Sequence, residues 1–179
     1  MTLVLPLDRG HMESKARLLG HSVHQMLVPI PIGLFVMATA CDVIVMTGHG
    51  PGLGYVAFCN LFAGVGAALA AGIFGAIDFS AIPRQSRASR IGLVHGLGNL
   101  LAVALFAASV ILRWNTPGHA PTTIGFALEI PAILLAGVAS FLGGELVVRL
   151  GVGVDDHAHV NAPSSRAVRQ HFAAKKMPP

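Results

Sequence analysis

The chain has 179 residues, of which 54% are hydrophobic and only 11% are charged, with a mean hydropathy of +0.69. Soluble domains usually carry about 25% charged residues, so this composition excludes an ordinary soluble domain and favours one membrane domain of a few spans. The formal net charge is +4, but no basic stripe is interleaved with aromatic residues, which argues against a nucleic-acid-binding surface.

Chain organisation follows from the apolar segments. Residues 1–20 are expected to form an N-terminal extension. They do not resemble a secretory signal, because the apolar run Leu3–Leu7 is too short. Either Met1 or Met12 is a candidate start. Residues 21–152 are expected to form the membrane domain and residues 153–179 a disordered tail. Four segments reach the about 20 residues that a spanning helix needs: Val23–Thr47, Gly54–Phe79, Ile91–Leu112 and Thr122–Val148.

The connections between these segments are short, which predicts an all-α, four-helix transmembrane bundle running up-down-up-down. Pro29 and Pro31 predict a kink in the first span. The second span is rich in glycine and alanine, which predicts close helix packing or, alternatively, room for a flat cofactor. We find no convincing internal repeat in the sequence.

Basic residues flank the spans unequally and predict the topology. They gather before span one, between spans two and three, and after span four, whereas the other two connections hold only Arg113. The positive-inside rule then places both termini in the cytoplasm. The residues on that side are Lys15, Arg17, Arg84, Arg87, Arg90, Arg149, Arg166, Arg169, Lys175 and Lys176.

Polar residues recur in the first three spans with one spacing. Three pairs lie 18 residues apart: His24 with Asp42, Asn60 with Asp78, and His95 with Arg113. Eighteen residues make five helical turns, or about 27 Å of rise, so each pair lies on one stripe of its helix near opposite sides of a bilayer. Ionisable residues within a membrane are candidates for function. The spacing therefore predicts two polar layers.

The inner layer contains the residue types of a ligand site. His24, Asp78, His95 and Glu145 are expected at similar depth, with His21 one turn before His24 and Asn99 one turn after His95. Two imidazoles from different helices at one depth are typical of axial haem ligation. In that interpretation His24 and His95 bind haem b, Asn99 supports the site, and Arg90 pairs with a propionate.

Other interpretations of the inner layer stay open. His21, His24, Asp78, His95 and Glu145 offer nitrogen and oxygen ligands that suit a transition metal without porphyrin. The same groups are also suited to proton or ion handling. Finally, they are compatible with a structural hydrogen-bonded cluster that binds no cofactor, in which Asp78 pairs with Arg84 or Arg87.

The outer layer favours a structural role. An ion pair between Asp42 and Arg113, with Asn60 as a hydrogen-bond partner, is the simplest arrangement, since a lone charge at a helix centre costs about 2.5–3.5 kcal/mol. Glu129 in span four is expected to face water. Cys41 and Cys59 lie near the same side of the membrane and are expected to be apolar packing residues, although a disulfide between them stays open.

Several of these motifs resemble a bacterial integral membrane protein family of unknown function, family 2231. They are Val28–Gly33 after His24, Gly75–Asp78, His95–Asn99, and Gly143–Val147 followed by Gly151–Val154. The resemblance covers about residues 21 to 154, except that Gln25 follows His24 where the family pattern often has proline. It implies a four-helix protein of the bacterial inner membrane and no established activity.

The leading hypothesis is a membrane subunit that carries electrons through haem b or another redox metal. Its partners would be the lipid bilayer together with a redox protein or a second copy of the chain. The alternative is a non-redox protein that handles an ion or small solute, or that serves as a structural subunit. No pairing of a nucleophile with a base is visible, and whether the chain is an enzyme stays open.

Overall fold

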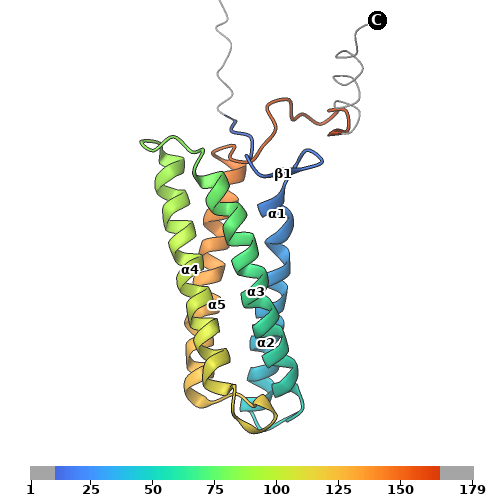
Figure 1. The fold of residues 1–179 in the computed structure, drawn as a ribbon, viewed down its shortest axis with the longest axis vertical. Helices are drawn as coiled ribbons and strands as arrows, with labels where there is room; N and C mark the ends of the chain where they lie inside the picture. The colour runs from blue at the N-terminus through green and yellow to red at the C-terminus, as the bar shows by residue number, and fades with distance from the viewer. Residues whose placement is uncertain (1–10, 166–179) are drawn as a thin grey trace, which may run out of the picture.

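The computed structural model describes residues 11–165, and within that range four long helices form an antiparallel bundle (Figure 1). The first span comprises α1 (Val23–Leu27) and α2 (Pro29–Met46), and the others are α3 (Leu53–Phe79), α4 (Arg87–Arg113) and α5 (Thr123–Val148). All four spans are long and apolar enough to cross a membrane. The predicted all-α four-helix bundle is confirmed.

The two ends of the bundle differ in chemistry. The end that carries the α3–α4 connection also carries the short strands β1 (Arg17–Leu18) and β2 (His21–Ser22), and we call it the basic end. The opposite end carries the short helix η1 (Pro117–His119), and we call it the Trp114 end. Because the number of spans is even, both described ends of the chain emerge at the basic end (Figure 1).

The proline-rich part of span one, where the sequence predicts a kink, is where the helix is interrupted between α1 and α2. Helix α1 ends at Leu27 and α2 begins at Pro29, but the intervening Val28 keeps helical angles (φ −52°, ψ −40°) and donates its amide to the His24 carbonyl at 3.1 Å. The stripe that joins His24 to Asp42 therefore continues through both helices.

Apolar packing fills the centre of the bundle. The rings of Phe35 in α2 and Phe106 in α4 stack with centroids 4.0 Å apart, and Leu61 in α3 and Ala132 in α5 are completely buried beside them. Gly64 admits the Phe35 ring, because a Cβ at that position would lie 2.7 Å from it. Close packing, one of the two interpretations of the small residues in span two, is thus confirmed at Gly64. Large apolar side chains such as Ile111 and Phe141 face outward, as expected in contact with lipid.

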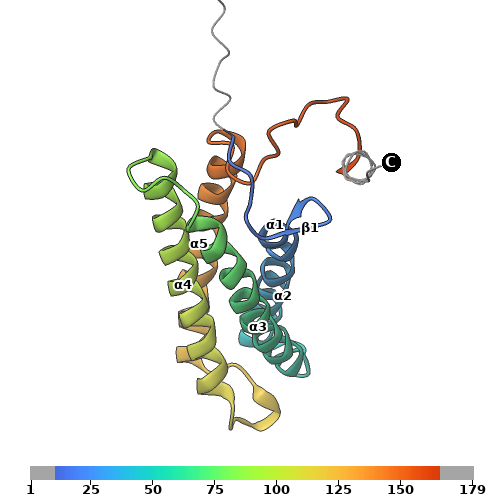
Figure 2. The same cartoon turned by 45° about the horizontal axis from the view of Figure 1, so that its top comes forward.

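The bundle consists of two helical hairpins that pack against each other. Figure 2 shows α1–α3 on one side and α4–α5 on the other. His24 and Phe35 in span one have identical residues 71 positions later, His95 and Phe106, and the matched residues meet each other across the bundle. The expectation of no convincing internal repeat stays a prediction.

The described N-terminal segment packs against the chain that follows α5. Met12 donates its amide to the Gly151 carbonyl at 3.0 Å, and its own carbonyl accepts from the Gly153 amide. Arg17 donates to the Asp155 carboxylate at 2.9 Å. The predicted start at Met1 and the predicted tail beyond residue 165 lie outside the described residues.

Candidate functional site

His24 and His95 meet inside the bundle toward its basic end. Their ring centroids are 6.3 Å apart and their planes are nearly perpendicular, at 89°. Both side chains are half-buried. The approach of the two histidines that the sequence predicted is confirmed, whereas their role as ligands stays a prediction.

Helix starts set the depth of both imidazoles. Ser22 caps α1 by accepting the Gln25 amide at 3.5 Å, which places His24 in the first turn. Ser86 caps α4 by accepting the Ser89 amide at 3.0 Å, and His95 follows two turns later. A serine at the N-cap satisfies an otherwise unpaired amide, so the sequence fixes where each helix begins.

Each imidazole is held by the neighbouring helix of its own hairpin. His24 Nδ1 lies 2.8 Å from the Ala71 carbonyl in α3, and His95 Nδ1 lies 2.8 Å from the Ala139 carbonyl in α5. A carbonyl only accepts hydrogen bonds, so both Nδ1 atoms carry the proton. The Nε2 atom of each ring is consequently the one with a lone pair for a ligand or a donor.

Glycines make the space that both imidazoles occupy. A Cβ at Gly75 would lie 2.9 Å from two atoms of the His24 ring, and a Cβ at Gly143 would lie 3.0 Å from the His95 ring. Each glycine is four residues after the alanine whose carbonyl holds the ring. The two histidine sites are therefore built in the same way by the two hairpins.

Asn99 is the polar side chain that adjoins His95 within α4. Its Nδ2 donates to the His95 carbonyl at 3.0 Å and lies 3.3 Å from His95 Nε2. The shorter bond secures Asn99 to the backbone, so the longer contact with Nε2 is the one that a ligand would replace. The predicted supporting role of Asn99 stays a prediction.

Asp78 does not join the histidines. It is buried, and its carboxylate accepts from Ser14 Oγ at 2.7 and 2.8 Å, from the Ala16 amide at 3.1 Å and from Ser22 Oγ at 3.4 Å. The predicted pairing of Asp78 with Arg84 or Arg87 was wrong, because residues of the N-terminal segment supply the hydrogen bonds that the carboxylate accepts. Asp78 thereby ties residues 14–22 to the end of α3.

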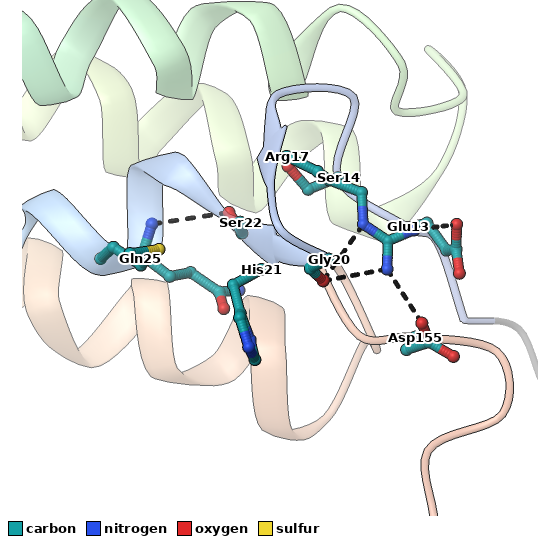
Figure 3. A pocket seen from close by; sticks show the side chains of 10 residues that line it. Glu13, Ser14, Arg17, Gly20, His21, Ser22, Gln25 and Asp155 are labelled. Atoms are coloured by element: carbon teal, nitrogen blue, oxygen red, sulfur yellow. Dashed lines mark hydrogen bonds and ion pairs between the residues drawn. The ribbon is translucent and has the colours of Figure 1, made fainter. Parts of the chain in front are cut away.

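The other predicted inner-layer residues lie at the basic end, where Glu145 is half-buried and His21 and Arg90 are exposed. Glu145 forms an ion pair with Arg87 at 2.6 Å, and Arg90 is exposed. His21 is exposed in β2 and lines a hollow beside Arg17 and Asp155 (Figure 3). Within residues 11–165 no group of three or more histidine, cysteine or acidic side chains is gathered around one point, so the predicted five-ligand metal set is not brought together.

The outer layer is a fully buried ionic cluster. Arg113 Nη1 and Nη2 donate to the two oxygens of Asp42 at 2.6 and 2.8 Å, and Nη1 also lies 3.5 Å from Glu129 Oε1. Ser109 Oγ donates to the same Glu129 oxygen at 2.6 Å. Arg113 Nε donates to the His119 carbonyl at 3.0 Å. The predicted Asp42–Arg113 pair is confirmed.

Two details of the predicted outer layer were wrong. Asn60 donates to the Val56 carbonyl of its own helix at 2.9 Å and does not join the pair. Glu129 does not face water, because its side chain is completely buried. The helix rotation that turns Glu129 inward depends on packing between α4 and α5, which no local pattern in span four reveals.

The family profile described as "Predicted membrane protein (DUF2231)" matches residues 20–156. The chain belongs to this family. No curated protein and no solved structure matches it.

The DUF2231 match contains both histidine sites and the whole ionic cluster. The holding carbonyls and the two glycines of the histidine sites were not recognised as site residues from the sequence. One signal could have revealed them: an alanine followed four residues later by glycine occurs at Ala71–Gly75 and again 68 positions later at Ala139–Gly143.

The cysteines of this DUF2231 protein are both free. Cys41 is buried in the apolar core, and Cys59 is exposed on α3. The disulfide that the sequence left open is therefore not formed. Cys41 packs among apolar residues of the core.

Proposed function

We propose that this DUF2231 protein binds haem b between His24 and His95 and carries electrons in the membrane. The observation that supports the proposal is the pair of imidazoles, one from each hairpin, that meet with their Nδ1 protons already engaged. The family itself has no established activity, so the proposal rests on the residues of this chain.

The residues of the pair fit a group held by two imidazoles. The rings come from different hairpins and their centroids are 6.3 Å apart, so His24 and His95 would both be able to hold one haem iron. The Nδ1 bonds to Ala71 and Ala139 keep Nε2 as the ligating atom of both rings. Such bonds orient a ligating histidine and raise its basicity.

Bound haem would supply one-electron chemistry at a potential set by its ligands and surroundings. If His24 and His95 both held the group, its chemistry would be electron transfer rather than bond-breaking catalysis, because the two imidazoles would leave no site on it for a substrate. Asn99 would support His95 through the backbone. Arg90, exposed near the start of α4, would be free to pair with a propionate.

The test is an optical spectrum of the full-length chain, expressed with haem supplied, purified and reduced with dithionite. We expect the sharp α-band of a low-spin haem, which His24→Ala and His95→Ala each abolish. His21→Ala is the matched control, because His21 lies three residues from His24 but is exposed in β2. An unaltered band in both site variants, or no band in the wild type, would remove the proposal.

A further inference from the structure

Two buried side-chain oxygens lack partners among the described residues. One is Glu129 Oε2, within the ionic cluster at the Trp114 end, and the other is Thr39 Oγ1 in α2. The Glu129 side chain is completely buried. Buried polar atoms are normally hydrogen-bonded, so Glu129 Oε2 requires an explanation in a cluster that is otherwise well paired.

The charges of the cluster do not balance if both carboxyl groups are ionised. Asp42 takes both terminal nitrogens of Arg113 and so accounts for its positive charge. Glu129 lies farther from Arg113, at 3.5 Å, and would add a second negative charge to a site without exposed atoms. Uncompensated buried charges are strongly unfavourable, and a buried carboxyl group avoids the cost by taking up a proton.

We propose that Glu129 is a proton-binding site in the membrane domain, with an exchangeable proton on Oε2 and the Ser109 hydroxyl on Oε1. The groups around it are Asp42 from α2, Arg113 from α4 and the His119 carbonyl of η1, which reaches the cluster through Arg113. When the proton leaves, the Glu129 carboxylate has to share the Arg113 guanidinium, 3.5 Å away, with Asp42, which leaves one negative charge in excess.

This site is separate from the proposed haem site. Along span one, Asp42 lies 18 residues from His24, about 27 Å of helix, and the Phe35–Phe106 stack fills the bundle between the two layers. Proton binding at Glu129 would therefore exist in the chain whether or not haem binds at the histidines.

Infrared spectroscopy of the full-length chain in lipid nanodiscs tests the proposal. The chain has eight acidic side chains, and at neutral pH we expect the carbonyl stretching band of a protonated acid from Glu129 alone. The band should shift in heavy water, because the proton is exchangeable, and Glu129→Gln should remove it. Glu145→Gln is the matched control on the same helix, and it should keep the band because Glu145 pairs with Arg87 near the surface.

A second variant assigns the band if Glu129→Gln does not fold. Ser109→Ala removes the hydrogen bond to Oε1 and should move the band to higher frequency, since the carbonyl is no longer weakened by a donor. A wild-type spectrum without a protonated-acid band at neutral pH would overturn the proposal. So would a band that both Glu129→Gln and Ser109→Ala leave unchanged.

Discussion

At the scale of single residues, each histidine site depends on a glycine. The Cβ that glycine lacks would occupy the space of the imidazole ring. A Cβ at Gly75 would lie 2.9 Å from the His24 ring, closer than real Cβ contacts, and a Cβ at Gly143 would lie 3.0 Å from the His95 ring, which would then have to shift. Alanine has a higher helix propensity than glycine by about 1 kcal/mol, so glycine at these positions lowers the stability of the helix. The reason is space for the imidazoles rather than helix stability.

Substitution of these glycines should separate site from scaffold. Gly75→Ala and Gly143→Ala should lower haem retention by roughly 10- to 100-fold, because they push His24 or His95 away from its holding carbonyl. Gly72→Ala and Gly144→Ala are matched controls, since a Cβ at either position meets nothing within 4 Å. The ratio of haem absorbance to protein absorbance after purification measures the effect. Equal haem content in all four variants would contradict the proposed geometry.

The buried pair in the outer layer permits a double-mutant test of its own. Asp42→Leu alone should lower the free energy of unfolding by about 3–5 kcal/mol, because it leaves the Arg113 guanidinium in a buried site without its main partner. The double variant Asp42→Leu with Arg113→Leu should recover much of that loss. Unfolding in mixed micelles measures both, and a double variant that is as unstable as the sum of the single ones would exclude a coupled pair.

Residue types and depths were predictable, but contact partners were only partly so. The depth of His24 and His95 follows from helix starts and counting, and the Asp42–Arg113 pair follows from opposite charge at one depth. Asp78 contacts Ser14, and Arg113 contacts Glu129. Asn60 instead bonds within its own helix. These partners depend on how each helix is rotated about its axis. That rotation is set by tertiary packing, which a single span does not encode.

At the scale of elements, spans one and three are matched helices that meet at three levels. His24 faces His95, Phe35 stacks on Phe106, and Asp42 pairs with Arg113, and each residue of span three lies 71 positions after its counterpart. The outer pair has opposite charges, whereas the two members of each of the other pairs are identical. An intact inner pair is what a ligand bound symmetrically by both hairpins would require.

The stacked rings of Phe35 and Phe106 should contribute most to the stability of the bundle. Phe106→Ala removes a completely buried ring, and we expect a loss of about 3–5 kcal/mol in the free energy of unfolding. Phe141→Ala is the matched control, because Phe141 is 75% exposed on α5. Thermal unfolding of both variants in one detergent tests this, and a smaller loss for Phe106→Ala than for Phe141→Ala would refute the assigned core.

The spans were predictable from composition and length, whereas the meeting of matched residues of spans one and three was not. Apolar segments above 20 residues coincide with α1–α5 to within a few residues at most of their ends. The match consists only of Val23-His24 with Leu34-Phe35 against Val94-His95 with Leu105-Phe106. Most positions between them need only be apolar, so the sequence carries few other marks of the match.

At the scale of the whole molecule, orientation in the membrane stays a proposal. We propose that the basic end faces the cytoplasm of a bacterium and that a redox partner protein docks there, near the histidine pair. The exposed residues Arg84, Arg87 and Arg90 gather at this end between spans two and three, and such charges set topology in inner-membrane proteins.

Reporter fusions test the orientation directly. A reporter that is active only in the cytoplasm should work when it is fused after residue 165, and a reporter that is active only outside should work when it is inserted at Gly118 in η1. The reverse pattern would show that the basic end faces outward. Replacement of Arg84, Arg87 and Arg90 by glutamine should weaken the preference, because the topological charge bias falls.

The most direct measurement of the central claim is the electron paramagnetic resonance spectrum of the oxidised, haem-loaded protein. Two axial imidazoles with planes near the observed 89° predict a low-spin ferric signal with strong anisotropy, typical of perpendicular ligand planes. His24→Ala and His95→Ala should each convert or eliminate that signal. A high-spin signal from five-coordinate iron in the wild type, or no haem iron at all, would contradict paired ligation by His24 and His95.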